Sequence, residues 1–533
     1  MSCASFSLTC SYSLLYTQSE FKVIESSSRM ADWIAMKLNH FSDLYNVQQR
    51  EEVLTEIKIK FANLDPDEAV EITRNLDLAR LLCQLIAIDK DFREQLCDAL
   101  TVLFKAAEPG QFLHRYTREL RELLTHREAA LKILALQEID RVASHPNSLP
   151  LLLTKLYLLL HVIQTVADNN LDVAKHSMDI LKKIGRNPDG LKTLYEGELL
   201  RTIAKLLKTN DVVTFRVYEV IVDIANHSKE CLEASIKSGF LQSLIDKLEN
   251  DDILLQLNAL ETLTSLALHQ EGLNYLEQHG VLQQLSQKIA QAHETPLSSL
   301  LIPGLMKFFG NVAQLCPNDI FSRYPPVISA LFEVIESNDQ TLLAIALDTL
   351  GYISTTVKGK YALQDLGYPM LNALKKIGDV IQKMPSELRV RGLNNLTVIL
   401  SVPKAEQDNR ILSLTKSWFD EICEKPLEII SSLCRQPFAD IRQASLEVLA
   451  VIGAQEWGQE YIANHPGLVE FLLDRNVESF KECKEAKFEV VKNLSDSVPN
   501  IFDATTMQRI KKFVSEGPFF VETITEIAIE GAS

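Results

Sequence analysis

The chain has 533 residues and a formal net charge of −17, with 46% hydrophobic, 23% charged and 7% aromatic residues. The hydrophobic fraction is too high for a disordered chain, and the negative charge disfavours a general nucleic-acid binder. Its 19 glycines and 18 prolines make up about 7% of the chain, where an average protein has roughly 12%. This scarcity argues against sandwiches, propellers and large α/β enzymes. A long, acidic, helix-rich protein remains.

Residues 1–29 differ from the rest of the chain because they are rich in serine. They lack the basic start and the sustained apolar run of a secretory signal. A helical pattern begins at Met30. We therefore predict that residues 1–29 are a disordered or non-native extension. A mitochondrial signal is the alternative, although only Lys22 and Arg29 are basic.

The most apolar stretch, Leu149 to Ile163, has 15 residues and contains Lys155 and His161. A membrane-spanning helix needs about 20 predominantly apolar residues. The stretch therefore predicts one buried helix, and no contact with a membrane is expected.

A nine-residue helical pattern recurs along the chain: small, apolar, x, x, apolar, x, x, apolar, small. Successive copies lie 40 to 53 residues apart, which fits the period of armadillo and HEAT repeats. The copies are Ala135–Ala143, Ser177–Gly185, Val217–Ala225, Ala259–Ala267, Leu305–Ala313, Ala346–Ser354, Gly392–Leu400 and Ser445–Gly453.

Turn residues fall between these copies at similar offsets. About 20 residues after each copy begins, a turn precedes a new apolar helix, as at Gly239, Gly280, Gly367 and Gly467. That helix then ends near an Asn or Asp turn, as in Lys205–Asp211 and Lys247–Asp251. The order helix, Gly turn, helix, Asn/Asp turn, helix resembles the armadillo layout more than the two-helix HEAT layout.

Each helix has an apolar stripe that one repeat cannot cover alone, whereas stacked repeats bury it in a continuous core. We therefore predict an all-α fold, an armadillo/HEAT-like α-solenoid that forms a curved superhelix of about eight or more repeats. It would be a single domain over residues 30–533, with a helical cap over about 30–127, repeats over about 128–475 and a second cap over about 476–533.

The chain has nine cysteines, an odd number, and no two of them have the C-x-x-C spacing. Neither a zinc knuckle nor a redox pair is therefore expected. Some lie in apolar runs, such as Cys83, where a free thiol acts as a small hydrophobic group. This usage favours a reducing compartment, and we expect a cytoplasmic protein, with the nucleus as the alternative.

Motifs for catalysis and cofactor binding are absent from the sequence. It has no G-x-x-x-x-G-K-[ST], G-x-G-x-x-G, G-x-S-x-G or H-E-x-x-H, and its eleven histidines are scattered. We therefore expect no enzyme activity, no cofactor and no metal, and look instead to the concave surface that a solenoid offers to partners.

Positions 3 and 7 of the pattern share the exposed helix face, because positions 2, 5 and 8 point into the core. Five of the eight residues at position 3 are carboxylates. One interpretation is an ordinary solvated helix face; the other is an acidic ladder that steers a basic partner surface. The candidate partner-binding residues are Asp179, Glu219, Asp223, Glu261, Asn311, Asp348 and Glu447.

Nuclear-import adaptors of the armadillo type carry Trp at position 3 and Asn at position 7 of successive repeats. Here no Trp occupies position 3, and only Asn311 occupies position 7. Binding of import signals is therefore disfavoured.

Several longer strings resemble one family, namely TNDVVTFRVYEVI (Thr209–Ile221), PGLMKFFGN (Pro303–Asn311), RYP (Arg323–Pro325), HPGLVEFLLDR (His465–Arg475) and SEGPFFV (Ser515–Val521). From about Met30 to the end, the chain resembles the 26S proteasome non-ATPase regulatory subunit 5 family. None of the strings is a chemical motif, so their specificity lies in their number and order.

The resemblance implies a chaperone for assembly of the 19S regulatory particle that leaves before or on completion of the particle. Its implied partners are base ATPase subunits: the C-terminal domain of the first ATPase subunit, with the second ATPase and the first non-ATPase scaffold subunit in the same module. No nucleic acid or membrane is implied, and the chain on its own would be a monomer. The alternative is a general armadillo/HEAT scaffold or adaptor for another complex.

Overall fold

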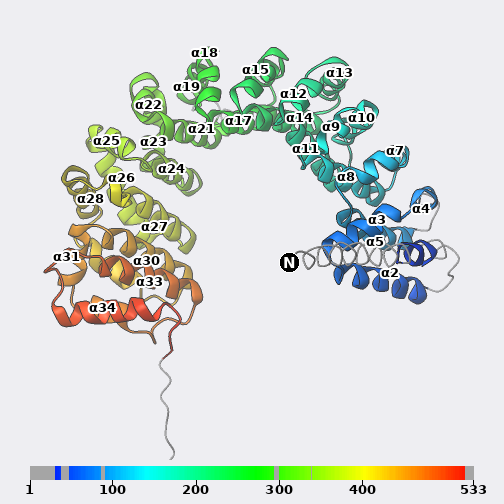
Figure 1. Cartoon of the computed structure of the whole chain (residues 1–533). Helices are drawn as coiled ribbons and strands as arrows, with labels where there is room; N and C mark the ends of the chain where they lie inside the picture. The colour runs from blue at the N-terminus through cyan, green and yellow to red at the C-terminus, as the bar shows by residue number, and fades with distance from the viewer. Residues whose placement is uncertain (1–29, 38–46, 86–89, 293–298, 338, 522–533) are drawn as a thin grey trace, which may run out of the picture. The chain divides into compact units, whose positions relative to one another are not determined.

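The computed structural model describes residues 30–37, 47–85, 90–292, 299–337 and 339–521 (Figure 1). In these ranges the chain forms helices joined by short turns, with no strand, so the predicted all-α class is confirmed. The contacts divide the chain into two compact units, Met1–Leu248 and Glu249–Ser533. The predicted extension over residues 1–29 lies outside the described residues.

The first unit contains fifteen α-helices within the described ranges from α2 onward. They are α2 (Val47–Ala62), α3 (Pro66–Asn75), α4 (Ala79–Leu85), α5 (Lys90–Ala106), α6 (Gln111–Arg115), α7 (Thr117–Thr125), α8 (Ala129–Ala143), α9 (Leu149–Leu153), α10 (Leu156–Thr165), α11 (Leu171–Gly185), α12 (Pro188–Leu194), α13 (Gly197–Leu206), α14 (Asp211–Ala225), α15 (Lys229–Lys237) and α16 (Phe240–Ile245).

The chain passes into the second unit through the 3-10 helix η2 (Asp246–Glu249). The described helices there are α17 (Ile253–Ala267), α18 (Gln270–Gln278), α19 (Val281–Gln291), α21 (Ile302–Leu315), α22 (Pro317–Arg323), α23 (Pro325–Glu336), α24 (Gln340–Ile353), α25 (Val357–Asp365), α26 (Tyr368–Lys383), α27 (Ser386–Leu400), η3 (Lys404–Glu406), α28 (Asn409–Glu421), α29 (Pro426–Leu433), α30 (Ala439–Gly453), α31 (Glu456–Asn464), α32 (Leu468–Leu473), α33 (Lys481–Ser495) and α34 (Ala504–Glu516).

Every copy of the predicted nine-residue pattern lies in the C-terminal part of a helix of 14 or 15 residues, and the copy in α24 ends at the adjoining Ser354. These helices pack side by side, α8 on α11 on α14 in the first unit and α17 through α21, α24, α27 and α30 to α33 in the second. We call them the long-helix layer. The helices between them, most of which are shorter, form the other layer of each unit.

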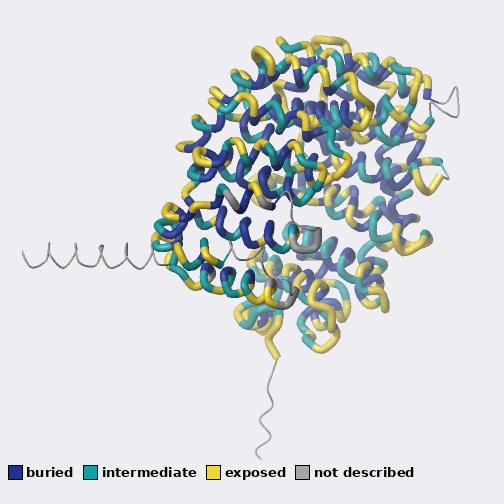
Figure 2. The backbone as a smooth tube through the Cα atoms, turned by 90° about the vertical axis from the view of Figure 1, so that its right-hand side faces the viewer, coloured by how far each residue is buried: buried dark blue, intermediate teal, exposed yellow. Residues whose placement is uncertain are grey.

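Burial follows the predicted periodicity. Leu136, Ile139 and Val142, at positions 2, 5 and 8 of the first copy, are fully buried. Figure 2 shows buried and exposed segments alternating along the helices, as amphipathic packing requires. The small residue at position 9 has a packing reason: a Cβ on Gly185 of α11 would lie 2.3 Å from Ile224 Cδ1 of α14.

The predicted turn signals are confirmed. Gly239, Gly280, Gly367 and Gly467 all have positive φ, between 69° and 78°, and each directly precedes a helix. A side chain would strain this left-handed backbone. At the other turn, the Asn210 side chain caps α14 by accepting a hydrogen bond from the Val213 N–H at 2.9 Å.

Two details differ from the predictions made from the sequence. The apolar stretch Leu149–Ile163 is broken into α9 and α10 at Thr154–Lys155, and Tyr157 is exposed rather than buried. Cys83 is exposed, so it does not act as a core residue. Helix α33, within the predicted C-terminal cap, packs on α30 of the last predicted repeat.

Candidate partner-binding surface

The seven candidate residues lie on the long-helix layer. Asp179 lies on α11, and Glu219 and Asp223 lie on α14, in the first unit. In the second unit, α17, α21, α24 and α30 carry one candidate each: Glu261, Asn311, Asp348 and Glu447. Glu219 and Glu261 are exposed and the other five are half-buried. The structure thus places the whole set on solvent-accessible helix faces.

In the first unit, two of the three candidate carboxylates form ion pairs with cationic residues of the preceding repeat. Glu219 pairs with Lys182 of the preceding long helix at 2.7 Å, and Asp223 pairs with Arg186 at 2.6 Å. One repeat earlier, Lys183 and Asp140 pair at 2.6 Å. Within the ranges that the structure describes, Asp179 forms no ion pair.

The second unit repeats this arrangement. Glu261 of α17 pairs with Lys307 of α21 at 2.7 Å. Asp348 of α24 pairs with Arg391 of α27 at 3.0 Å, and accepts a hydrogen bond from Asn395 Nδ2 at 2.9 Å. Glu447 instead accepts a hydrogen bond from Gln443 of its own helix at 2.9 Å.

Pairing changes the electrostatics of this surface. A carboxylate beside a cation projects a weaker field, and an exposed pair contributes only about 0–1 kcal/mol to stability. The proposed steering therefore depends most on Asp179 and Glu447, and it stays a prediction. A search for opposite charges one repeat apart would have found the pairs, which are separated by 37 to 46 residues.

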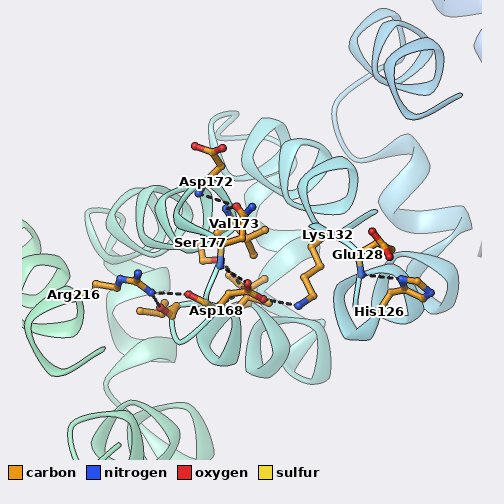
Figure 3. A network of polar contacts seen from close by, with 12 residues as sticks. His126, Glu128, Lys132, Asp168, Asp172, Val173, Ser177 and Arg216 are labelled. Atoms are coloured by element: carbon orange, nitrogen blue, oxygen red, sulfur yellow. Dashed lines mark hydrogen bonds and ion pairs between the residues drawn. The ribbon is translucent and has the colours of Figure 1, made fainter. Parts of the chain in front are cut away.

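A partly buried polar network in the first unit joins three successive long helices (Figure 3). Lys132 of α8 pairs at 2.5 Å with Asp168, in the turn before α11. The backbone oxygens of Val166 and Asp168 accept hydrogen bonds from Arg216 of α14 at 2.9 and 2.8 Å. The Asn170 side chain caps α11. These polar groups satisfy one another, so the network fixes the packing of the helices.

A groove opens on the long-helix layer of the second unit, between α24 and α27 with Gln314 of α21 at one end. Its volume is about 610 Å³. Tyr352 and Val398 line it and are 43% and 36% exposed, so the groove presents an aromatic ring and an apolar side chain to solvent. Polar groups surround them, namely Asp348, Glu387, Arg391, Asn394 and Asn395. We call this the α24–α27 groove.

The shape of the groove depends on Gly351. A Cβ there would lie 2.3 Å from Asn395 Oδ1. Because glycine leaves this space free, Asn395 can reach Asp348 and connect the two walls. Of the residues that line the groove, Asp348 was predicted from the sequence, whereas Tyr352 and Val398 were not, although both occupy position 7 of their repeats.

Glu447 lies in a separate acidic hollow of about 540 Å³ between α30 and α33. Glu482, Glu485 and Glu489 of α33 line the same hollow. Two of these carboxylates pair with lysines of their own helix, Glu485 with Lys481 and Glu489 with Lys492. The hollow therefore keeps a negative potential on a part of the layer distinct from the α24–α27 groove.

Within the described ranges, no group of three or more His, Cys, Asp or Glu side chains is arranged to hold a metal ion. No helix there is both long and apolar enough to cross a bilayer.

Comparison with known proteins gives one consistent result. Residues 30–533 match the family model described as "Proteasome non-ATPase 26S subunit". A relative named 26S proteasome non-ATPase regulatory subunit 5 from Homo sapiens is 34% identical over 495 residues, covering 92% of this chain and 98% of the relative. Proteins of the same name from Bos taurus and Mus musculus are 36% and 35% identical over 451 residues, covering 84% of this chain and 90% of each relative. The resemblance seen in the sequence is thereby confirmed, and the chain belongs to the 26S proteasome non-ATPase regulatory subunit 5 family.

Proposed function

We propose that this chain is a chaperone for assembly of the 19S regulatory particle of the 26S proteasome. It would bind the C-terminal domain of the first base ATPase subunit, in a module with the second ATPase and the first non-ATPase scaffold subunit. It would leave before or on completion of the particle. The family name supports a proteasome-related role, and the chaperone step is our inference from the resemblance.

The observation that carries the proposal is the α24–α27 groove. It exposes the apolar side chains of Tyr352 and Val398 beside charged residues, among them the ion pair of Asp348 and Arg391. Apolar anchors within a polar rim are typical of specific protein interfaces, where aromatic residues contribute much of the binding energy. The rim is solvated and charged, which suits a partner that must later dissociate.

The stacked helices supply the rest of the interface. A specific contact buries at least about 1,000 Å² in total, more than the groove alone provides. The neighbouring faces of α21, α24, α27 and α30 form one continuous layer beside it. A domain bound there would cover several repeats, and this coverage would block its premature docking on the core particle.

The family and the all-helical fold do not suggest catalytic activity, and we assign none. We expect the protein to act as a monomer, to need no cofactor, and to work in the cytoplasm, with the nucleus as the alternative site. The second candidate function is a general scaffold for another complex, which the same layer could also serve.

The test is affinity purification of the tagged chain from cells, followed by identification of its partners. Recovery of base ATPase subunits without core-particle subunits would support the chaperone. Recovery of an unrelated complex, such as import cargo or a phosphatase, would overturn it in favour of the general scaffold.

A matched pair of tyrosine variants tests the groove. We expect Tyr352→Glu to reduce recovery of the ATPase at least tenfold, because a carboxylate would replace the aromatic anchor of the groove. Tyr368→Glu is the control, since Tyr368 is 81% exposed on α26 in the other layer. Equal recovery with both variants would show that the groove is not the binding site.

A further inference from the structure

A second hollow, of about 830 Å³, lies at the end of the second unit, far along the chain from the α24–α27 groove. Helices α33 and α34 and the segment between α32 and α33 form its walls. Five cationic residues line it: Arg475, Lys484, Lys487, Arg509 and Lys512. We call it the basic hollow. It is unexpected in a chain whose net charge is −17.

The acidic residues of the hollow are already engaged. Glu478 pairs with Arg442 at 3.2 Å, and Glu516 pairs with Arg475 at 3.1 Å and with Lys512 at 3.7 Å. The Asp474 carboxylate accepts a hydrogen bond from the Asn476 N–H at 2.9 Å.

Three of the five cationic residues of the hollow have no acidic partner in the described part of the chain. Among the described residues, no carboxylate lies within ion-pair distance of Lys484, Lys487 or Arg509. Lys487 is only 3% exposed, and its Nζ donates a hydrogen bond to the backbone oxygen of Asp474. The hollow therefore has an excess of positive charge and attracts an anionic group.

One side of the hollow is apolar. Phe513, Pro518, Phe520 and Val521 line it. The Arg475 guanidinium lies 3.9 Å from the ring centre of Phe513 and 5.3 Å from that of Phe520, which holds this wall in place. Phe520 and Val521 nevertheless remain 41% and 74% exposed. A ligand that fits must combine carboxylates with apolar side chains.

The chain itself contains such a segment. The sequence of residues 522–533 has three carboxylates, Glu522, Glu526 and Glu530, and no Lys or Arg. Isoleucines at 524, 527 and 529 lie between these glutamates. We propose that the basic hollow is the docking site of this acidic segment, residues 522–533, with its glutamates paired to Lys484 and Arg509.

Tethering favours this occupant over any other acidic peptide. The segment begins directly after Val521, which lines the hollow. A short tether gives an effective concentration in the millimolar range, so a modest intrinsic affinity keeps the segment bound. Once docked, it would cover Phe520 and Val521 and shield the hollow from acidic segments of other proteins.

The experiment compares the full-length chain with a variant that ends at Val521, after circular dichroism has verified that both are equally helical. The probe is a fluorescein-labelled peptide with the sequence of residues 522–533, followed by fluorescence anisotropy at low salt. We expect the truncated chain to bind it with a Kd of about 0.1 mM or below. The full-length chain should bind it at least tenfold more weakly, because its own segment, at an effective concentration in the millimolar range, occupies the hollow.

Charge reversal locates the site. In the truncated chain, the double variant Lys484→Glu/Arg509→Glu should weaken binding by about tenfold or more. Neither residue forms an ion pair in the described chain, so the change breaks no such contact. The control is Lys229→Glu/Lys358→Glu, two exposed lysines on α15 and α25. Equal weakening by both double variants, equal binding by full-length and truncated chains, or no binding by the truncated chain would overturn the proposal.

Discussion

Replacing Lys360 with methionine tests how the walls of the α24–α27 groove are held together. Lys360 lies on α25 and is fully buried. Its Nζ donates hydrogen bonds to the backbone oxygens of Ser354 at 2.6 Å, Val398 at 3.0 Å and Ile399 at 2.8 Å. These oxygens lie at the C-terminal ends of α24 and α27, where carbonyl groups lack partners within the helix. One ammonium group therefore caps both helices.

Two opposing effects set the change in the free energy of unfolding of Lys360→Met. Methionine keeps the apolar volume but leaves the buried oxygens of Ser354 and Ile399 without their donor, at about 1–3 kcal/mol each, or roughly 2–6 kcal/mol in total. The Val398 oxygen still accepts a hydrogen bond from the Ser401 N–H at 3.3 Å. Burial lowers the pKa of Lys360 from 10.5 to about 7. Holding the lysine in the folded state at pH 7 therefore costs roughly 4 kcal/mol, which methionine avoids. Near pH 7 the two effects nearly offset, and we expect similar stabilities.

The dependence of the free energy of unfolding on pH separates these two effects. Between pH 7 and 10.5 the unfolded chain binds more protons than the folded chain at this residue, so the free energy of unfolding of the wild type rises with pH. The contribution amounts to about 2 kcal/mol between pH 7 and pH 9. The variant Lys360→Met lacks it. We therefore expect this variant to lose about 2 kcal/mol relative to the wild type over that range.

The assay is urea unfolding followed by circular dichroism at pH 7, 8 and 9. Hydrogen exchange of the amides in α24 and α27 serves as a local readout. The control is Lys358→Met, since Lys358 is exposed on the same helix. If the difference between Lys360→Met and the wild type stays constant from pH 7 to pH 9, the titration argument is refuted. Unchanged exchange in α24 and α27 at pH 9 would refute the capping role.

Three further changes test the packing and the charges of the stack. Gly359→Ala should destabilise the second unit by roughly 1–3 kcal/mol in thermal unfolding, because a Cβ would lie 1.9 Å from the Ile353 oxygen; Lys358→Ala is the control. Neutralising Asp179 and Glu447 together, as Asp179→Asn and Glu447→Gln, should slow association with the ATPase several-fold at low salt, and an unchanged rate would favour the ordinary solvated face. Lys307→Glu and Glu261→Lys should each lower the free energy of unfolding by no more than about 1 kcal/mol. The double variant, which restores the 2.7 Å ion pair with its charges exchanged, should recover that loss. If it does not, the two residues are not energetically coupled.

The sequence predicted the elements of the fold because their signals are local. The nine-residue pattern repeats the 3.6-residue period of a helix and recurs at the repeat length, so it predicted all-α secondary structure and stacking together. The turns could also be predicted from the sequence, since Gly239 and its equivalents adopt positive φ and Asn210 caps a helix through its own side chain. These features depend on residues within a few positions of one another.

A second repeated signal was present in the sequence but was missed. In four repeats, glycine is the third residue of the short helix that follows a long one. A Cβ at these positions would lie 1.9 to 2.2 Å from the backbone oxygen at the end of the preceding long helix. The glycines are Gly190, Gly272, Gly359 and Gly458. Their common offset from the pattern could have identified them as packing residues.

Contacts between repeats could not be predicted, because they depend on how far each helix is offset along its neighbour. That offset brings Lys182 to Glu219 and Arg391 to Asp348, so most of the carboxylates on the predicted ladder are paired. It also buries Lys360 against two helix ends and opens the groove around Tyr352. The chain alone thus determined the repeat, the turns and the family. Only the tertiary structure decided which charges are free and where an apolar anchor is exposed, because both depend on contacts between residues about one repeat apart.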